Sequence, residues 1–504
     1  MQELAATYPG PAAIRSDVGP LEQWQFRPTA VGGFGDSFNA YAHTMVWFKD
    51  ALYVGTTRAN LCLLKNRLPL DVKSWPVNCP DDVYQLDLRA QIWSFDPRRA
   101  KWRQAFVAPV IAGRDGQPVA RELGYRGMTV FQGPRDREPA LYVATWAPSK
   151  ARGPLVLRSE DGYTFTPVSR TGLTDPTISA FRTLVSFNGR LYITPAGRAG
   201  GKPNTPDNPV VMQTDDPSTG VWRVASVPGF GDSGNLTVFE MAVFNGFLYA
   251  GTLNPQTGYQ IWKTRSGGTS HVWQRVIVNG AHRGPLNEAV VSMTPFRGSL
   301  YVGSGIQNGG FDRTHDIGPA APELIRLHPD DSWDLVVGEP RWTAQGLKRP
   351  LADYDSGFDD PFNGYFWRMA EYDGVLYLGT FKWSSLLPYL QPAPRHLAGK
   401  LLCRLGVENI ANFDSGFDLF SSRDGLRWSP VTTSGFGNPY NFGARTLVGT
   451  PYGLFVGTAN PFGREVAART AAGWSYVPNP RGGAEVWLGA RAPAGSNGHE
   501  ALDW

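Results

Sequence analysis

One short phrase recurs along this chain of 504 residues and limits its fold more than any other feature. A run of alternating apolar residues leads into a tight turn and then into Leu-Tyr-x-Gly-Thr, as in MAVFNGFLYAGT from Met241. Asn-Gly, Arg-Gly or Asp-Gly between two alternating apolar runs is typical of a β-hairpin. The copies place their leucines at Leu52, Leu141, Leu191, Leu248, Leu300, Leu376 and Leu454. Each copy therefore predicts the first two strands of a repeated unit.

Two further strands complete each unit. A third run such as YQIWKT from Tyr259 follows the hairpin, and a fourth run is marked by Trp or Phe, as at Trp273. Four antiparallel strands per repeat are the pattern of a β-propeller blade. Residues WQFRPTAVGGFGDSFN from Trp24 resemble the fourth run from Trp222, whereas the chain ends on a third run, AEVWLG from Ala484. We therefore predict an all-β, seven-bladed propeller with four-stranded blades, one domain over residues 1–504, closed by an N-terminal outer strand.

Composition agrees with many short strands and argues against several functions. The chain has 58 Gly and 41 Pro, only 18% of its residues are charged, and its formal net charge is +4. Without a basic run, nucleic-acid binding is not expected. Without a long apolar run or a signal-peptide pattern, neither a membrane span nor secretion is expected. Cys62, Cys79 and Cys403 are odd in number and far apart, which favours reduced thiols and a cytoplasmic protein.

The longest connections predict the functional face. They follow the second strand of their units, at residues 58–89, 196–209, 305–322 and 381–416. In an antiparallel blade this connection lies on the same face as the start of the first strand, and long loops on a rigid scaffold often carry function. Residues 58–89 and 381–416 are expected to be insertions over that face. The segment from His396 has helical spacing and could form a lid or pack as a helix on a neighbour.

The starts of the first strands place polar and aromatic side chains at the mouth of the central channel. The catalytic candidates are Arg368, Glu240, Arg126 and Arg445. The substrate-binding candidates are His43, Tyr41, Arg182, Phe239, Trp367 and Tyr365. A guanidinium in a funnel is desolvated unless it is paired, and its fork suits carboxylates, phosphates or halide-like anions. We expect a small aromatic or anionic substrate, although the arginines could instead bond to carbonyls and carboxylates of neighbouring blades.

Other motifs carry narrower expectations. Asparagines thirteen residues before the repeat leucines predict locks between loop and strand, at Asn39, Asn235, Asn287, Asn363 and Asn441. Residues 308–318 and 353–360 are candidate calcium loops, because hard cations prefer several oxygens in a short loop. No other cofactor is expected and no metal ligand is assigned. SEDGYTF from Ser159 and SRDGLRW from Ser422 resemble shortened forms of the Asp-box, a structural turn of sialidase-like propellers.

The repeat as a whole, and RTLVGTPYGLFVGTANPFG from Arg445 in particular, resembles a bacterial propeller family. This family includes the cylindrocyclophane-forming Friedel–Crafts alkylating enzyme, whose N-terminal calcium-binding domain has no counterpart in these residues. The resemblance implies an enzyme of specialised metabolism that forms a carbon–carbon or carbon–oxygen bond between an alkyl halide and an aromatic compound. An arginine would stabilise the leaving halide, and an acid such as Glu240 would polarise or deprotonate a phenol.

Two alternatives from other functional classes stay open. A non-catalytic propeller would use the same face to bind a protein or peptide. A sialidase-like glycoside hydrolase would need three arginines on the substrate carboxylate, a Tyr/Glu pair and an acid. A deep, closed funnel favours an enzyme and a broad, open face favours an interaction module. We expect a monomer or a dimer.

Overall fold

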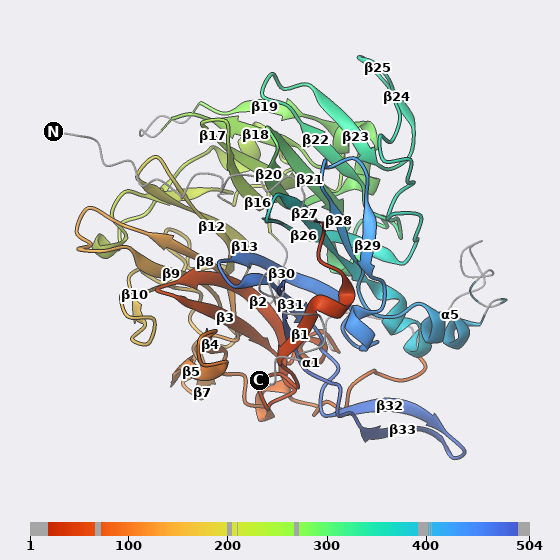
Figure 1. The fold of residues 1–504 in the computed structure, drawn as a ribbon. Coiled ribbons are helices and arrows are strands. Elements are labelled where there is room, and N and C mark those ends of the chain that lie inside the picture. The colour runs from red at the N-terminus through yellow and green to blue at the C-terminus, as the bar shows by residue number, and fades with distance from the viewer. Residues whose placement is uncertain are drawn as a thin grey trace.

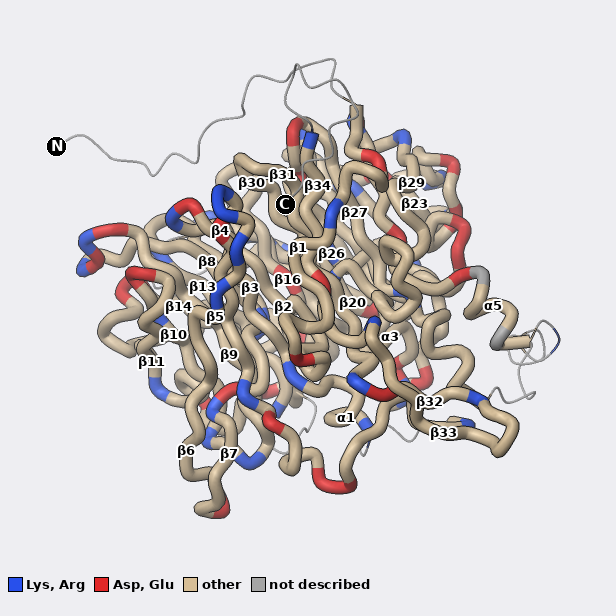
Figure 2. Tube along the Cα trace, turned by 60° about the horizontal axis from the view of Figure 1, so that its bottom comes forward, with Lys and Arg blue, Asp and Glu red and all other residues tan. Residues whose placement is uncertain are grey.

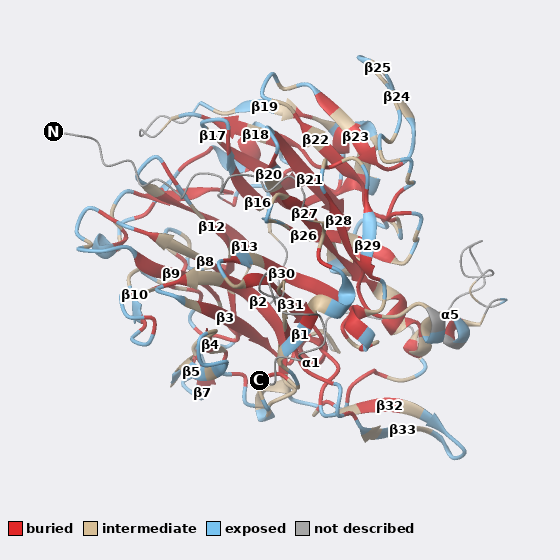
Figure 3. Cartoon of the chain, in the orientation of Figure 1, coloured by how far each residue is buried: buried red, intermediate tan, exposed pale blue. Residues whose placement is uncertain are grey.

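The computed structural model describes residues 19–65, 72–198, 204–208, 210–266, 272–391, 402, 404 and 406–491. Within these ranges, 28 strands form one hydrogen-bonded sheet that surrounds the centre of the molecule (Figure 1). The strands of its interior are buried and the connecting loops at the periphery are exposed (Figure 3). The fold is therefore β-rich and propeller-like.

The sheet is built from antiparallel units of four strands. The unit nearest the N-terminus contains β2 (Asn39–Phe48), β3 (Ala51–Arg58), β4 (Gln91–Asp96) and β5 (Lys101–Val107). The second unit contains β8 (Gly124–Phe131), β9 (Ala140–Trp146), β10 (Val156–Ser159) and β11 (Thr166–Pro167). The third unit contains β12 (Ile178–Phe187), β13 (Arg190–Arg198), β14 (Met212–Thr214) and β15 (Arg223–Val224).

The same order of pairing continues along the chain. The fourth unit contains β16 (Thr237–Phe244), β17 (Phe247–Leu253), β18 (Ile261–Thr264) and β19 (Gln274–Ile277). The fifth unit contains β20 (Ala289–Phe296), β21 (Ser299–Gly305), β22 (Leu324–Leu327) and β23 (Trp333–Val337). The next contains β26 (Asn363–Tyr372), β27 (Val375–Lys382), β28 (Leu419–Ser422) and β29 (Ser429–Thr432).

The last unit joins the two ends of the described chain. It contains β30 (Gly443–Thr450), β31 (Gly453–Ala459), β34 (Val486–Gly489) and β1 (Phe26–Ala30). β1 pairs with β34 in antiparallel register, with Phe26 opposite Gly489 and Pro28 opposite Trp487. The predicted N-terminal outer strand is thus found where the sequence placed it.

Smaller elements lie outside the 28-stranded sheet. Hairpins are formed by β6 (Val110–Ala112) with β7 (Pro118–Ala120), β24 (Arg341–Thr343) with β25 (Gly346–Lys348), and β32 (Glu465–Thr470) with β33 (Gly473–Pro478). The described α-helices are α1 (Asn60–Lys65), α2 (Asn279–His282), α3 (Gln307–Gly310) and α5 (Val407–Phe413). The 3-10 helices are η1 (Gln23–Gln25), η2 (Val83–Gln85), η4 (Pro217–Thr219), η5 (Pro228–Gly231), η6 (Gly284–Asn287), η7 (Trp383–Tyr389) and η8 (Gly435–Gly437). Among the described helices, none has the length and apolar character needed to cross a bilayer.

The repeated glycine of Leu-Tyr-x-Gly-Thr is explained by the packing of neighbouring units. A Cβ on Gly251 of β17 would lie 2.4 Å from Cβ of Val290 on β20, and one on Gly379 of β27 would lie 2.3 Å from Cβ of Ala444 on β30. Such distances are well inside van der Waals contact, so only glycine lets the first strand of the next unit approach.

The two Asp-box-like turns are structural, as predicted. In the first, the Ser159 hydroxyl donates to Asp161, whose carboxylate accepts the backbone N–H groups of Tyr163 and Thr164. A Cβ on Gly162 would meet the hydroxyl of Tyr53 in the preceding unit at 1.9 Å. Gly425 stands in the same relation to Tyr301, also at 1.9 Å. Both turns therefore pack one unit against the previous one.

The asparagine locks are confirmed. Asn235 donates through Nδ2 to the carbonyl of Gly229 at 2.9 Å and to Oε1 of Gln260 at 2.9 Å. Asn441 likewise donates to the carbonyl of Gly435 at 3.0 Å and to the Glu485 carboxylate at 2.6 Å. The remaining asparagines of the set, Asn39, Asn287 and Asn363, make the same type of pair. Each one ties the loop before a first strand to the start of a third strand.

The segments after β3, β27 and β31 meet over one end of the sheet. Val72 bridges to Leu390, and Val77 bridges to Val466 of β32. The helix η7 packs against α5, which begins within the segment predicted to be helical from His396. Most of the residues of that segment before α5 lie outside the described residues. The β32–β33 hairpin, which extends from the body near this end (Figure 1), belongs to an insertion that the sequence reading missed.

The expectation of reduced cysteines is wrong for two of the three. Cys62 and Cys79 form a disulfide that closes the segment after β3 on itself. The two cysteines are 17 residues apart in the sequence, so the sequence pattern did not show that the fold brings them together. Because disulfides persist mainly in oxidising compartments, the argument from the cysteines for a cytoplasmic location no longer holds.

Candidate active site in the central cavity

A cavity of about 970 Å³ lies between the starts of the first strands and the insertions. Its floor and inner wall come from the first strands, through Tyr41, His43, Arg126, Arg182, Phe239, Tyr365, Trp367 and Arg445. Its roof comes from the insertions, through Leu61, Leu64, Val72, Trp75, Trp383 and Tyr389. These are all the residues predicted to form the site except Arg368 and Glu240, which do not line the cavity.

Two of the floor arginines have no protein partner among the described residues. Arg445 is only 3% exposed, and its Nη1 atom is buried without a hydrogen bond. The Nε atom of Arg126 is likewise buried and unpartnered. Their guanidinium carbons lie 5.3 Å from the ring centres of Trp367 and Trp146 respectively. The aromatic faces offset part of the desolvation of these cations but satisfy none of their N–H groups.

The other two arginines are bound to the protein. Arg182 donates from Nε to the carbonyl oxygen of Phe239 at 2.8 Å, and its guanidinium carbon lies 3.6 Å from the ring centre of Phe239. Arg368 donates from Nη1 to Oε2 of Glu240 at 2.8 Å. Bonding to a neighbouring unit, which the sequence left open for all four, therefore holds for Arg182. Arg368 bonds instead to a unit that is not its neighbour, and Arg126 and Arg445 bond to neither.

The floor carries a marked excess of positive charge. Burial lowers the pKa of Arg126 to about 10. Burial, followed by the charge of Arg126, lowers that of Arg182 to about 9. The pKa of Arg445 falls well below its ordinary value, first through burial and then through the charges of Arg368, Arg182 and Arg126. The same causes, burial first and then Arg445, lower the pKa of His43 well below its ordinary range. His43 is therefore neutral at pH 7, with its Nδ1 atom 2.6 Å from Oγ1 of Thr57.

Two tyrosines complete the polar part of the wall. The Tyr41 hydroxyl donates to Oδ1 of Asn60 at 2.9 Å, and burial raises the pKa of Tyr41. The Tyr365 hydroxyl accepts the backbone N–H of Gly309 at 2.6 Å, and burial raises its pKa to about 12. Both side chains are therefore un-ionised hydroxyl groups at neutral pH.

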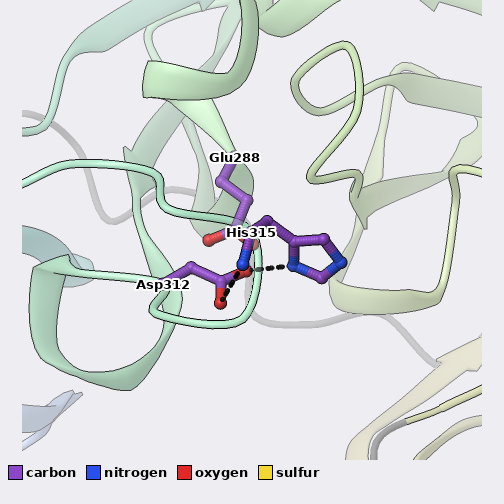
Figure 4. Close-up of side chains that lie close together, drawn as sticks. All are labelled: Glu288, Asp312 and His315. Carbon is purple, nitrogen blue, oxygen red and sulfur yellow. Dashed lines mark hydrogen bonds and ion pairs between the residues drawn. The ribbon is translucent and has the colours of Figure 1, made fainter.

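One predicted calcium loop contributes to a cluster beside the cavity. Glu288, Asp312 and His315 bring their ligand-type atoms within 4.8 Å of one another (Figure 4). Burial, and then the hydrogen bond with Asp312, raise the pKa of Glu288 to about 8, whereas the pKa of Asp312 is lowered. Glu288 is therefore protonated at neutral pH beside the ionised carboxylate of Asp312. This donor set is smaller than the six to eight oxygens that calcium prefers.

The other predicted calcium loop is tied to a lysine. Asp360 of that loop, together with Asp414 and Asp418, pairs with the buried ammonium of Lys382. The Nζ atom lies 2.7 Å from Asp360 and 3.0 Å from Asp418. The positive charge at this position is therefore supplied by the chain, and the cluster holds the end of β27 to the C-terminal end of α5.

Several cavity residues were not predicted from the sequence. They are Asn60, Trp75, Gln307, Phe381, Trp383, Tyr389 and Phe442. Most of them belong to insertions or follow second strands, where the repeat gives no register. The only signal in the sequence was the concentration of aromatic residues in segments otherwise typical of loops.

Comparisons with known proteins leave the activity open. No protein-family model and no curated protein matches the chain. Among solved structures, it is similar to the GH74 xyloglucanase from Xanthomonas campestris, with 15% identity, a TM-score of 0.45, and coverage of 92% of this chain and 56% of that one. It is also similar to a puromycin-hydrolysing peptidase of Mycobacterium tuberculosis, with 13% identity, a TM-score of 0.42, and coverage of 90% of this chain and 57% of that one. A third similar structure is Trypanosoma rangeli sialidase in complex with sialic acid, with 12% identity, a TM-score of 0.35, and coverage of 68% of this chain and 52% of that one. The chain thus spans little more than half the length of these proteins, and matches at this level assign no activity.

Proposed function

We propose that this chain is an enzyme whose central cavity binds a small organic anion with an aromatic or other apolar body. One observation carries the proposal: the guanidinium groups of Arg126 and Arg445 are buried at the cavity floor with N–H groups that no described residue accepts. A buried cation without a partner is unfavourable, and a bound anion would offset that cost.

The charge balance of the floor supports an anion and not a cation. Three arginines, Arg126, Arg182 and Arg445, line it, and the nearby carboxylate of Glu240 is bound to Arg368. The imidazole of His43 is neutral. A carboxylate, phenolate or halide would therefore enter a region of uncompensated positive charge, where a guanidinium fork donates two hydrogen bonds at once.

The walls define the rest of the ligand. Tyr41, Phe239, Trp367 and Phe442 line the cavity together with the roof residues Trp75 and Tyr389. Apolar walls with a few polar groups at fixed positions are typical of sites for small molecules. An aromatic ring would pack against these side chains at the edge-to-face geometry that Trp367 already adopts with Tyr41 and with Phe442.

The shape of the site favours an enzyme over an interaction module. The insertions after β3, β27 and β31 cover the floor, so the arginines lie in a cavity beneath them. Charged residues elsewhere are scattered over the chain (Figure 2). We further propose that the four-stranded units are the blades of a seven-bladed propeller centred on this cavity.

Alkylation of an aromatic ring is one reaction that such a floor would support. A ring carbon would attack the carbon that bears the halogen, the carbon–halogen bond would break with its electron pair on the halide, and a ring proton would leave. Arg126 or Arg445 would stabilise the halide, and the ring proton would pass to the solvent. The unpartnered arginines are the observation that favours this reaction.

Hydrolysis of an acidic glycoside, as in a sialidase-like enzyme, is the second candidate. Arg126, Arg182 and Arg445 line one cavity, as recognition of a sugar carboxylate by three arginines would need. The required Tyr/Glu pair is missing from the described cavity lining, which contains tyrosines but no glutamate. Release of a chromogenic aglycone from an acidic sugar, compared with release of chloride from an alkyl chloride in the presence of resorcinol, separates the two reactions.

Binding is tested first, by isothermal titration calorimetry with benzoate and phenylacetate. We expect Arg445→Gln and Arg126→Gln each to raise the dissociation constant about 10- to 100-fold, as the loss of a charged hydrogen bond does. Arg98→Gln is the matched control, because the side chain of Arg98 is 67% exposed on the surface. Equal binding by the wild type and both cavity variants would contradict the proposal.

A further inference from the structure

The side chain of Gln307 is fixed in the cavity wall by two carboxyl groups. Its Nε2 atom donates to Oε1 of Glu288 at 2.8 Å and to Oδ2 of Asp312 at 2.8 Å. Its backbone N–H donates to Oε2 of Glu288, also at 2.8 Å. Asp312 is in turn held by the backbone N–H of Thr314 at 2.8 Å and by Nδ1 of His315 at 2.6 Å (Figure 4). The amide is therefore held at several points.

These bonds determine which way the amide faces. An amide nitrogen has two hydrogens, and both are used on Glu288 and Asp312. The reverse orientation would set the amide oxygen against the ionised carboxylate of Asp312, whose pKa is lowered. The oxygen Oε1 is therefore the free end of the group. No described residue donates a hydrogen bond to it, and Gln307 lines the cavity.

We propose that Gln307 determines specificity by accepting, at Oε1, a hydrogen bond from a hydroxyl or N–H group of the ligand. The inference rests on the proposed function and deepens it: the substrate is an organic anion that also carries a hydrogen-bond donor. Its anionic group lies on Arg126 and Arg445, and its donor faces the loop of residues 306–318.

The fixed position of this amide is what would give it selectivity. A side chain that is already held loses little rotational freedom when it binds, so the bond to a ligand donor is not offset by ordering. A ligand with a methyl ether at the same place would leave Oε1 of Gln307 without a donor, and its methyl group would clash with that oxygen. Sites built to bind a hydroxyl group reject analogues that lack the donor for this reason.

The test compares benzoate with the hydroxybenzoates and methoxybenzoates that carry the substituent at each ring position, by titration calorimetry. In the wild type, we expect one hydroxybenzoate to bind about 3- to 10-fold more tightly than its methoxy counterpart. In Gln307→Leu and Gln307→Met, that ratio should fall to about one while the affinity for benzoate stays within about twofold. Gln345→Leu, on the exposed turn between β24 and β25, is the matched control and should keep the wild-type ratio.

Three results would overturn the inference. The first is a hydroxy preference that persists in both Gln307 variants, and the second is a wild type without that preference at any ring position. The third is the absence of benzoate binding, which would remove the proposed function and this inference with it. Leu and Met differ in shape, so if circular dichroism shows that one Gln307 variant is misfolded, the other still tests the hydroxy preference.

Discussion

Arg368 and Glu240 join two units that are not neighbours. Arg368 extends from β26 and Glu240 from β16, and the unit of β20–β23 lies between them in chain order, yet Nη1 of Arg368 is 2.8 Å from Oε2 of Glu240. The ion pair therefore spans the inner end of the sheet. It also neutralises the charge of Arg368, which does not line the cavity.

Removal of the Glu240 charge should weaken the fold. Glu240→Gln leaves Arg368 without its counter-charge among other guanidinium groups, and we expect the free energy of unfolding to fall by about 2 kcal/mol. Urea unfolding measures this change. Glu371→Gln, on the exposed side of the same strand β26, should change the stability by less than about 0.5 kcal/mol. A double-mutant cycle with Arg368→Met that shows no coupling would mean that the pair does not act as one unit.

Gly251→Ala tests the packing between units. The added methyl group would meet Val290 of the next unit, and we expect a loss of about 1–3 kcal/mol in the free energy of unfolding. Gly19→Ala is the control, because a Cβ there meets only the flexible end of Arg423, at 3.4 Å. A fall in stability no larger than that of the control would show that the units can separate without strain.

The proton on Glu288 should make stability depend on pH. The folded pKa of Glu288 is raised to about 8, above its ordinary value of 4.5, so the unfolded chain releases this proton first. Its contribution to stability is fully present below about pH 4.5 and is lost as the pH rises towards 8, by up to about 1.4 kcal/mol per pH unit. Glu288→Gln should remove this part of the slope. Urea unfolding between pH 5 and pH 8 checks it, and parallel curves for the two proteins would contradict it.

The disulfide should stabilise the roof of the cavity. Cys62→Ser with Cys79→Ser opens a loop of 17 residues, and we expect a loss of about 3 kcal/mol. Because the chain has three cysteines, thiol titration in denaturant should find one free thiol without reductant and three after reduction. Three thiols in the untreated protein would contradict the pairing. Calorimetric scans of the double variant measure the stability.

Much of the sheet could be predicted from the sequence, because alternation of apolar residues and hairpin turns are local signals. Asn245 and Gly246 both have positive φ, of 47° and 72°, as the two-residue hairpin between β16 and β17 requires. The pairing of β1 with β34 was predictable because the residues from Trp24 resemble a fourth strand and those from Ala484 resemble a third one.

The contacts of the site were less predictable. Arg126, Arg182 and Arg445 occupy equivalent repeat positions, yet Arg182 has a protein partner and the other two do not. That difference depends on which side chains face across the centre, and a repeat pattern holds no such information. The insertions were missed in part for a similar reason: the β32–β33 hairpin and the Cys62–Cys79 disulfide are fixed by contacts between segments far apart in the chain.

The pairing of Tyr41 on β2 with Ala459 on β31 has a consequence for how the molecule unfolds. This contact joins the unit nearest the N-terminus, which contains β2, to the last unit, which contains β31 and β1. Neither unit therefore has a free side. In an open array of repeats, terminal units fray first and unfolding proceeds inward. Here every unit is flanked on both sides, and loss of any one exposes two others. The whole chain should therefore melt as a single cooperative event.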